Sequence, residues 1–164
     1  DYLFVHEFGH HFASLADEYY TSATAYEMGS DVVEPYELNV TTHTEKNKIK
    51  WGDLITEDTP LPTPWGQEEF DKHGNKVQKR REQLRAQKAS EKTMEKLFKN
   101  QREWEENYLS NVKHTGKIGA YEGAMYHSKG IYRSEPNCIM FTRTDEFCAA
   151  CQRAINMVID QYTK

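Results

Sequence analysis

Two histidines and a glutamate near the start of the chain have the spacing of a metal-dependent catalytic centre. They lie in the segment His6-Glu7-Phe8-Gly9-His10. On a helix, side chains four positions apart share one face and lie about 6 Å apart, so both imidazoles can bind one small cation. A glutamate beside the first histidine can then act as general base on a water molecule at that cation. The pattern is typical of Zn²⁺-dependent hydrolysis of peptide bonds.

A third ligand has to come from elsewhere, because catalytic zinc normally takes three protein ligands. Asp17 is the first candidate. On a continuous helix it would lie about 10 Å beyond the second histidine, too far to share a metal. We therefore predict that the helix ends near Ser14 and that the chain turns back there. Glu18 and Glu122 are the alternatives for this ligand.

The surrounding sequence predicts the elements that must position these residues. Apolar residues at helical spacing predict a buried helix over residues 1–16, and Gly9 within it indicates close packing against another element. Residues 19–64 are predicted to form ordered loops with short strands near 37–40. Residues 67–109, rich in both signs of charge, predict a helical hairpin or one long helix, and residues 145–162 predict a last helix with Thr144 or Asp145 as N-cap. Four glycines between residues 116 and 130 predict tight turns of the kind that build binding surfaces.

The three cysteines, Cys138, Cys148 and Cys151, lie near one another in the sequence. A disulfide from Cys138 to either of the other two is the favoured interpretation. Two alternatives are a zinc site completed by a histidine and a set of three buried, reduced thiols.

Several blocks of the sequence, in order, resemble the IgA peptidase family of zinc metallopeptidases, which is metzincin-like. The blocks are His6-Glu7-Phe8-Gly9-His10, Leu15-Ala16-Asp17-Glu18-Tyr19, Pro60-Leu61-Pro62-Thr63-Pro64, Gly119-Ala120-Tyr121-Glu122-Gly123-Ala124, Gly130-Ile131-Tyr132-Arg133, Cys138-Ile139-Met140 and Phe147-Cys148-Ala149-Ala150-Cys151. One departure is that the family usually has glycine where Ser14 stands.

The resemblance implies a function for individual residues. By it, His6, His10 and Asp17 bind Zn²⁺ and Glu7 is the general base. Met140 would be the methionine of the Met-turn beneath the metal. A tyrosine near that turn can assist the oxyanion in metzincins, and Tyr132 is the candidate here.

The resemblance also implies a fold and a domain organisation. The fold class would be α+β, a metzincin-like zincin catalytic domain, of which this chain is mainly α with long loops. With 164 residues, 37% of them hydrophobic, the chain has room for one modest domain. We expect residues 1–164 to be the C-terminal part of one catalytic domain, without the N-terminal sheet of such domains and with a helical insertion at 67–109.

The expected function is that of a zinc endopeptidase acting on a protein or peptide substrate. The alternatives are a catalytically inactive, metal-containing binding or adhesin module and a zinc amidase acting on cell-wall peptides. A net charge of −5 gives no electrostatic case for nucleic acid, and no apolar run suggests a membrane span. The resemblance alone implies a bacterial protein with an extracytoplasmic location, which could be secreted, periplasmic or at the cell surface.

Overall fold

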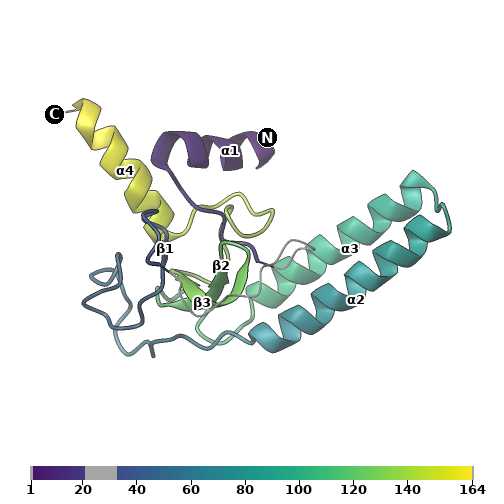
Figure 1. Cartoon of the computed structure of the whole chain (residues 1–164), viewed down its shortest axis with the longest axis horizontal. Coiled ribbons are helices and arrows are strands. Elements are labelled where there is room, and N and C mark those ends of the chain that lie inside the picture. The colour runs from purple at the N-terminus through teal and green to yellow at the C-terminus, as the bar shows by residue number, and fades with distance from the viewer. Residues whose placement is uncertain (1, 21–32, 164) are drawn as a thin grey trace.

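Helices dominate the structure, and a small antiparallel sheet lies among them (Figure 1). This computed structural model describes residues 2–20 and 33–163, so part of the loop region expected at 19–64 lies outside the described residues. The elements are α1 (Tyr2–Ala13), β1 (Val40–Thr41), α2 (Gln67–Ala86), α3 (Glu91–Leu109), β2 (Tyr121–Ala124), β3 (His127–Arg133) and α4 (Ala149–Thr163). A mainly helical chain with long loops is therefore confirmed.

The three strands form a sheet of order β1-β3-β2, with both pairs antiparallel. Val40 in β1 and Tyr121 in β2 both pair with Arg133, so the end of β3 is the centre of the sheet. Met125 and Tyr126 form the two-residue connection from β2 to β3, and both have positive φ, 50° and 65°. The short strand expected near residues 37–40 begins at the last of these positions.

The side chain of Arg133 is fully buried beside this sheet. Its guanidinium stacks over the rings of Phe141 and Trp65, at 3.9 and 4.6 Å from the ring centroids. It donates hydrogen bonds to three main-chain carbonyls, those of Glu122, Gly123 and Pro136. The arginine thus joins the sheet to the loop that follows it.

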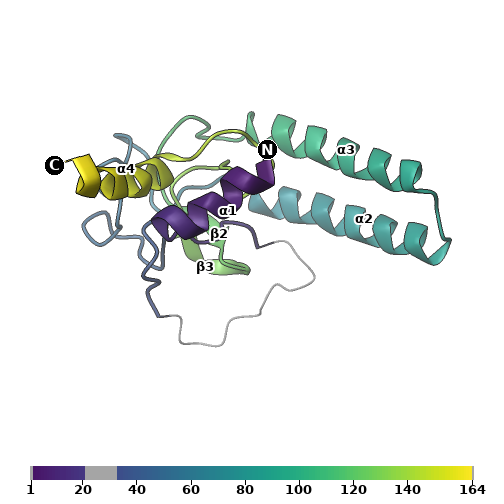
Figure 2. The same cartoon turned by 90° about the horizontal axis from the view of Figure 1, so that it is seen from above.

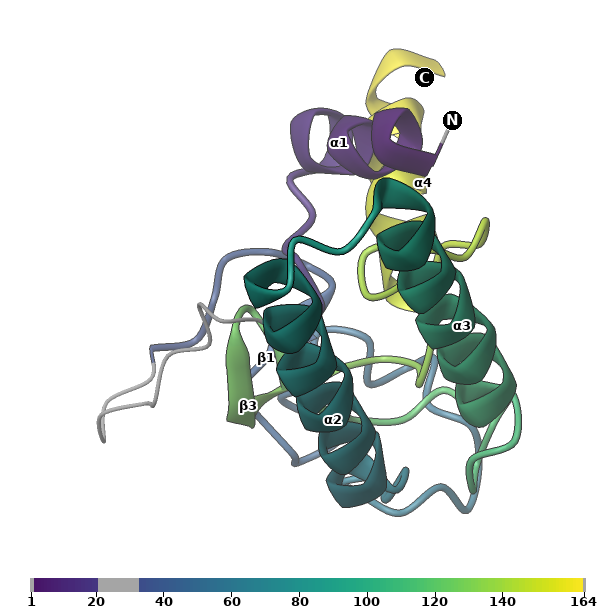
Figure 3. The same cartoon turned by 90° about the vertical axis from the view of Figure 1, so that its right-hand side faces the viewer.

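Helices α2 and α3 lie side by side as an antiparallel hairpin (Figure 3), which extends away from the sheet (Figure 1). The two helices are separated by residues 87–90, and the Ser90 side chain caps α3 by accepting from the Thr93 amide at 3.3 Å. At the base of the hairpin, the ring of Phe70 packs against those of Trp65 and Phe141. Of the two forms expected for residues 67–109, the hairpin is the one observed. No helix in the described part of the chain has the length and apolar character to cross a membrane.

Helix α1 packs across α4 (Figure 2). The sequence placed the start of this last helix at Thr144 or Asp145, which is wrong by about one turn. Helix α4 begins at Ala149, where the amide donates to the Glu135 carboxylate at 2.6 Å, and the next amide donates to the Ser134 hydroxyl at 3.4 Å. Side chains distant in sequence cap the helix, so local sequence could not reveal its start.

Candidate active site

The chain reverses direction immediately after α1, as the sequence predicts. Ser14 has a φ of 49°, a left-handed conformation that glycine adopts more easily than serine does. The Leu15 amide then donates to the carbonyl of Gly9 at 3.3 Å, which closes the turn. This reversal returns Asp17 to the face of α1 that carries the two histidines.

His6, His10 and Asp17 come together in a group that we call the histidine cluster. Asp17 Oδ1 lies 3.1 Å from His6 Nε2 and 3.2 Å from His10 Nε2. The two Nε2 atoms are themselves 3.2 Å apart. The two alternative ligands lie elsewhere: Glu18 faces the cysteines, and Glu122 accepts from Lys129 and from the Gly130 amide.

The hydrogen bonds of the two imidazoles determine what the histidine cluster can bind. His6 Nδ1 lies 3.0 Å from the carbonyl oxygen of Ile139, and His10 Nδ1 lies 2.6 Å from that of Leu15. A carbonyl can only accept, so each Nδ1 carries a proton, and Nε2 is the nitrogen that each ring has available for a metal. With both Nε2 atoms deprotonated, two lone pairs and a carboxylate oxygen converge on one point, an arrangement that a bound cation stabilises. These donors fit Zn²⁺.

Two other residues named from the sequence lie beside the histidine cluster. Glu7 is exposed on α1, next to the first histidine. Met140 is fully buried beneath α1, and a Cβ atom placed on Gly9 would lie only 3.2 Å from its sulfur. The glycine thus permits the close packing that the sequence indicated.

Two tyrosines extend the histidine cluster by hydrogen bonds. Tyr126 Oη donates to Asp17 Oδ2 at 2.6 Å. Since this uses the only hydroxyl proton of Tyr126, Tyr19 must be the donor in the 2.8 Å bond between the two tyrosines. Burial, together with the hydrogen bond to Asp17, raises the pKa of Tyr126, so its hydroxyl remains a donor.

Tyr126 is not the tyrosine that the sequence analysis named. Tyr132 lies in β3, paired with Glu122 of β2, and its hydroxyl contacts the Glu122 carboxylate. Sequence gave no signal for Tyr126, because its position depends on the turn between β2 and β3.

Replacing Tyr126 by phenylalanine should lower the zinc affinity of the histidine cluster by about 10- to 100-fold, because Asp17 loses the partner that orients it. Zinc competition against a chromophoric chelator measures the change. Tyr132→Phe is the matched control and should leave the affinity unchanged. Equal effects of the two substitutions would show that the bond to Asp17 has no special role.

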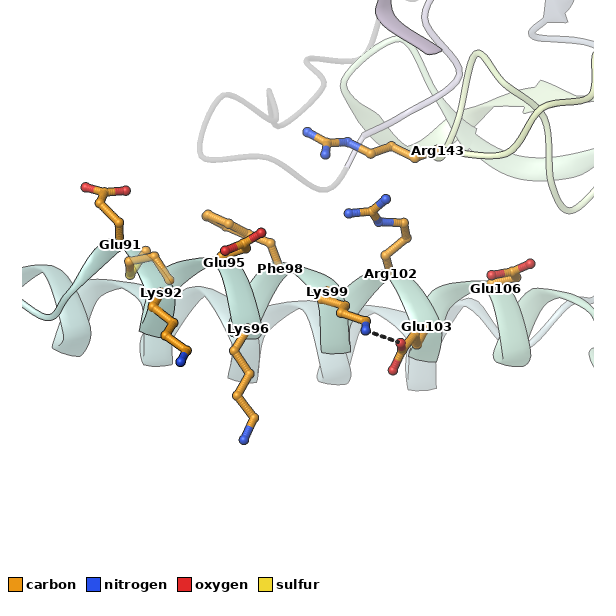
Figure 4. Close-up of a pocket in the computed structure, with 11 residues that line it drawn as sticks. Glu91, Lys92, Glu95, Lys96, Phe98, Lys99, Arg102, Glu103, Glu106 and Arg143 are labelled. Carbon is orange, nitrogen blue, oxygen red and sulfur yellow. Dashed lines mark ion pairs between the residues drawn. The ribbon is translucent and has the colours of Figure 1, made fainter. Parts of the chain in front are cut away.

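A pocket of about 330 Å³ opens beside the histidine cluster. Its lining includes His10, Ser14, Asp17, Tyr36, Glu37, Met125 and Tyr126. A larger groove of about 730 Å³ runs along α3, where Arg102 and Arg143 reach into the same space from opposite sides (Figure 4). That groove contains no residue of the histidine cluster, so the smaller pocket is the one suited to hold a substrate for chemistry there.

The three cysteines are free, so the expected disulfide is not formed. The Sγ atoms of Cys138 and Cys151 are 3.8 Å apart, well beyond a sulfur–sulfur bond of about 2.05 Å. The residue that completes their group is Glu18 rather than a histidine.

The sequence comparison identifies the class of protein to which this site belongs, which is that of the peptidases. The chain matches the family model described as IgA Peptidase M64 over residues 1–159, and it belongs to that family. The resemblance found in the sequence is thereby confirmed. A search of curated proteins returned no match.

Proposed function

We propose that the protein is a zinc-dependent endopeptidase in which His6, His10 and Asp17 hold the metal and Glu7 is the general base. The observation that carries the proposal is the convergence of three acceptor atoms within 3.2 Å of one another, with both Nδ1 protons committed to carbonyls. Membership of a peptidase family supports a protein or peptide as substrate.

Each part of the proposed site has a distinct role in hydrolysis. Bound zinc would supply a Lewis acid that polarises the scissile carbonyl and acidifies water. Glu7, exposed beside the first histidine, accepts the proton of the attacking water and returns it to the leaving amine. Tyr126 keeps Asp17 in place, and the Ile139 and Leu15 carbonyls hold the two imidazoles in the tautomer that leaves Nε2 free.

The proposal also covers the fold type, the domain organisation and the location of the protein. A metzincin-like arrangement is supported by Met140, buried directly beneath the helix of the two histidines. We also propose that the hairpin of α2 and α3 is an insertion in the catalytic domain. An extracytoplasmic location rests on the family resemblance only.

Removing the metal tests the proposal directly. Treating the purified protein with a chelator should abolish cleavage of an unfolded protein substrate, and adding Zn²⁺ back should restore it. Unchanged cleavage by metal-free protein would overturn the proposal. Bound zinc without any cleavage would instead indicate a binding module, and cleavage of small cell-wall peptides alone would indicate an amidase.

A further inference from the structure

A second group of side chains of the types that ligate metals contains Glu18, the residue after Asp17. It consists of Glu18, Cys138, Cys148 and Cys151, which we call the cysteine cluster. We infer that the cysteine cluster holds a second metal ion, a thiolate-preferring divalent cation such as Zn²⁺, and that this ion has a structural role.

The distances within the cysteine cluster match tetrahedral coordination. The Sγ atoms of Cys138 and Cys151 are 3.8 Å apart, and Glu18 Oε1 lies 3.3 Å from the sulfurs of Cys148 and Cys151. With Zn–S bonds of about 2.3 Å, a regular tetrahedron places two sulfurs about 3.8 Å apart. All four ligand atoms lie within 4.8 Å of one another, so one ion can reach all of them.

The burial of the cysteine cluster indicates a structural site rather than a catalytic one. None of its four side chains is more than 2% exposed. Four protein ligands complete a tetrahedral shell and leave no open position for substrate or water. Burial also makes a redox role unsuitable, because thiol exchange requires access to a sulfur.

Surrounding groups are arranged to support charged ligands. The amides of Met140 and Cys148 donate to the sulfur of Cys138, at 3.5 and 3.3 Å. The side-chain amide of Asn39 donates to Glu18 Oε1 at 3.1 Å. These are the outer hydrogen bonds that orient metal ligands. The second oxygen of Glu18 is buried and has no hydrogen-bond partner within the described residues.

Arg133 provides an independent reason to expect charge in the cysteine cluster. Its guanidinium is fully buried, and its hydrogen bonds go to neutral carbonyls. Buried charges normally require a counter-charge. Glu18, Cys138 and Cys148 are close enough to interact electrostatically with this arginine. Three thiolates and one carboxylate around a divalent cation have a net charge of −2, which supplies that counter-charge.

Such an ion would also fix the backbone that supports the histidine cluster. Glu18 directly follows Asp17, and its amide donates to the Met140 carbonyl at 2.8 Å. Ile139, the residue before Met140, accepts the hydrogen bond from His6 Nδ1 at its carbonyl oxygen. This connection rests on the proposed function, whereas the second metal site does not.

Cobalt substitution in a His10→Ala variant isolates the cysteine cluster. The substitution removes a ligand of the histidine cluster only. We expect the variant to keep one Co²⁺ per chain, with the thiolate-to-cobalt charge-transfer absorption that nitrogen and oxygen ligands cannot produce. A charge-transfer band with unchanged peptidase activity in His10→Ala would support the second site while overturning the proposed function.

Substitutions within the cysteine cluster complete the test. Cys151→Ala should lose the charge-transfer band. Glu18→Cys should bind the ion more tightly and raise the intensity of the charge-transfer band by about one third, because four thiolates then bind the ion instead of three. This second variant tests the site even if Cys151→Ala fails to fold. Absence of the band in both His10→Ala and Glu18→Cys would overturn the inference. So would a disulfide, detected as one free thiol instead of three after unfolding in a chelator.

Discussion

Glu7→Gln should retain zinc in the histidine cluster and lose peptide hydrolysis by roughly 10²- to 10⁴-fold, the usual contribution of general acid–base catalysis. Glutamine has nearly the shape of glutamate but cannot accept the proton of the attacking water. Glu7 is exposed and is not part of the group of three converging ligand atoms, so its replacement should not disturb metal binding. Zinc content and turnover of a protein substrate, measured on the same preparation, check both parts.

Glu82→Gln is the matched control for this experiment. Glu82 is also an exposed glutamate on a helix, but it lies on α2 in the hairpin. Its replacement should change neither zinc content nor turnover. Full activity in Glu7→Gln, purified in parallel so that contaminating proteases are excluded, would contradict the role given to Glu7.

Asp17→Ala should reduce the metal content by one ion per chain and abolish hydrolysis. It removes one of three ligands, and two neutral imidazoles alone bind zinc weakly. The loss of affinity should exceed the 10- to 100-fold expected when only an outer hydrogen bond to a ligand is removed. Elemental mass spectrometry gives the stoichiometry, and a zinc competition titration gives the affinity.

Glu122→Gln provides the comparison for Asp17→Ala. The sequence offered Glu122 as an alternative third ligand. In the structure its carboxylate instead accepts hydrogen bonds from the Lys129 side chain and the Gly130 amide. Zinc content should therefore be normal in Glu122→Gln. The reverse pattern, with zinc lost in Glu122→Gln and retained in Asp17→Ala, would refute the assignment of the third ligand.

Helical periodicity revealed most of the fold. It located α1 and the helical segment at 67–109, because amphipathic helices repeat their pattern over many residues, but it did not decide between a hairpin and one long helix. The strands β2 and β3 were not identified as such. Residues 121–133 contain two glycines and no regular alternation, and the connection at Met125 and Tyr126 lacks the usual turn residues. Strands β2 and β3 pair because of tertiary contacts, which a local sequence pattern does not encode.

The candidate site was predictable where it depends on local spacing. His6 and His10 are four positions apart, and on a helix this spacing places them on one face. Asp17 could be proposed because a turn of the chain near Ser14 would bring its carboxylate back to the two histidines. Tyr126 depends on a strand connection more than 100 residues away from Asp17 in sequence, and no local pattern indicated it.

A glycosylation sequon shows the same limit of local patterns. Asn39 matches the sequon Asn39-Val40-Thr41, yet it is fully buried. Its side chain accepts from the Ala16 amide at 2.8 Å and donates to Glu18. The motif is therefore inaccessible in the folded chain, and the asparagine supports the loop that carries Asp17.

The turn between β2 and β3 has a consequence for the balance between stability and activity. Met125 and Tyr126 both occupy the left-handed region, in a two-residue connection where Asn-Gly is the preferred sequence. Side chains with a Cβ pay a conformational penalty there of about 1 kcal/mol or more each. Selection for stability alone would therefore favour Asn-Gly and remove the hydroxyl that holds Asp17. The strained turn is therefore a site where thermostabilising design would raise the melting temperature while removing the hydrogen bond to Asp17.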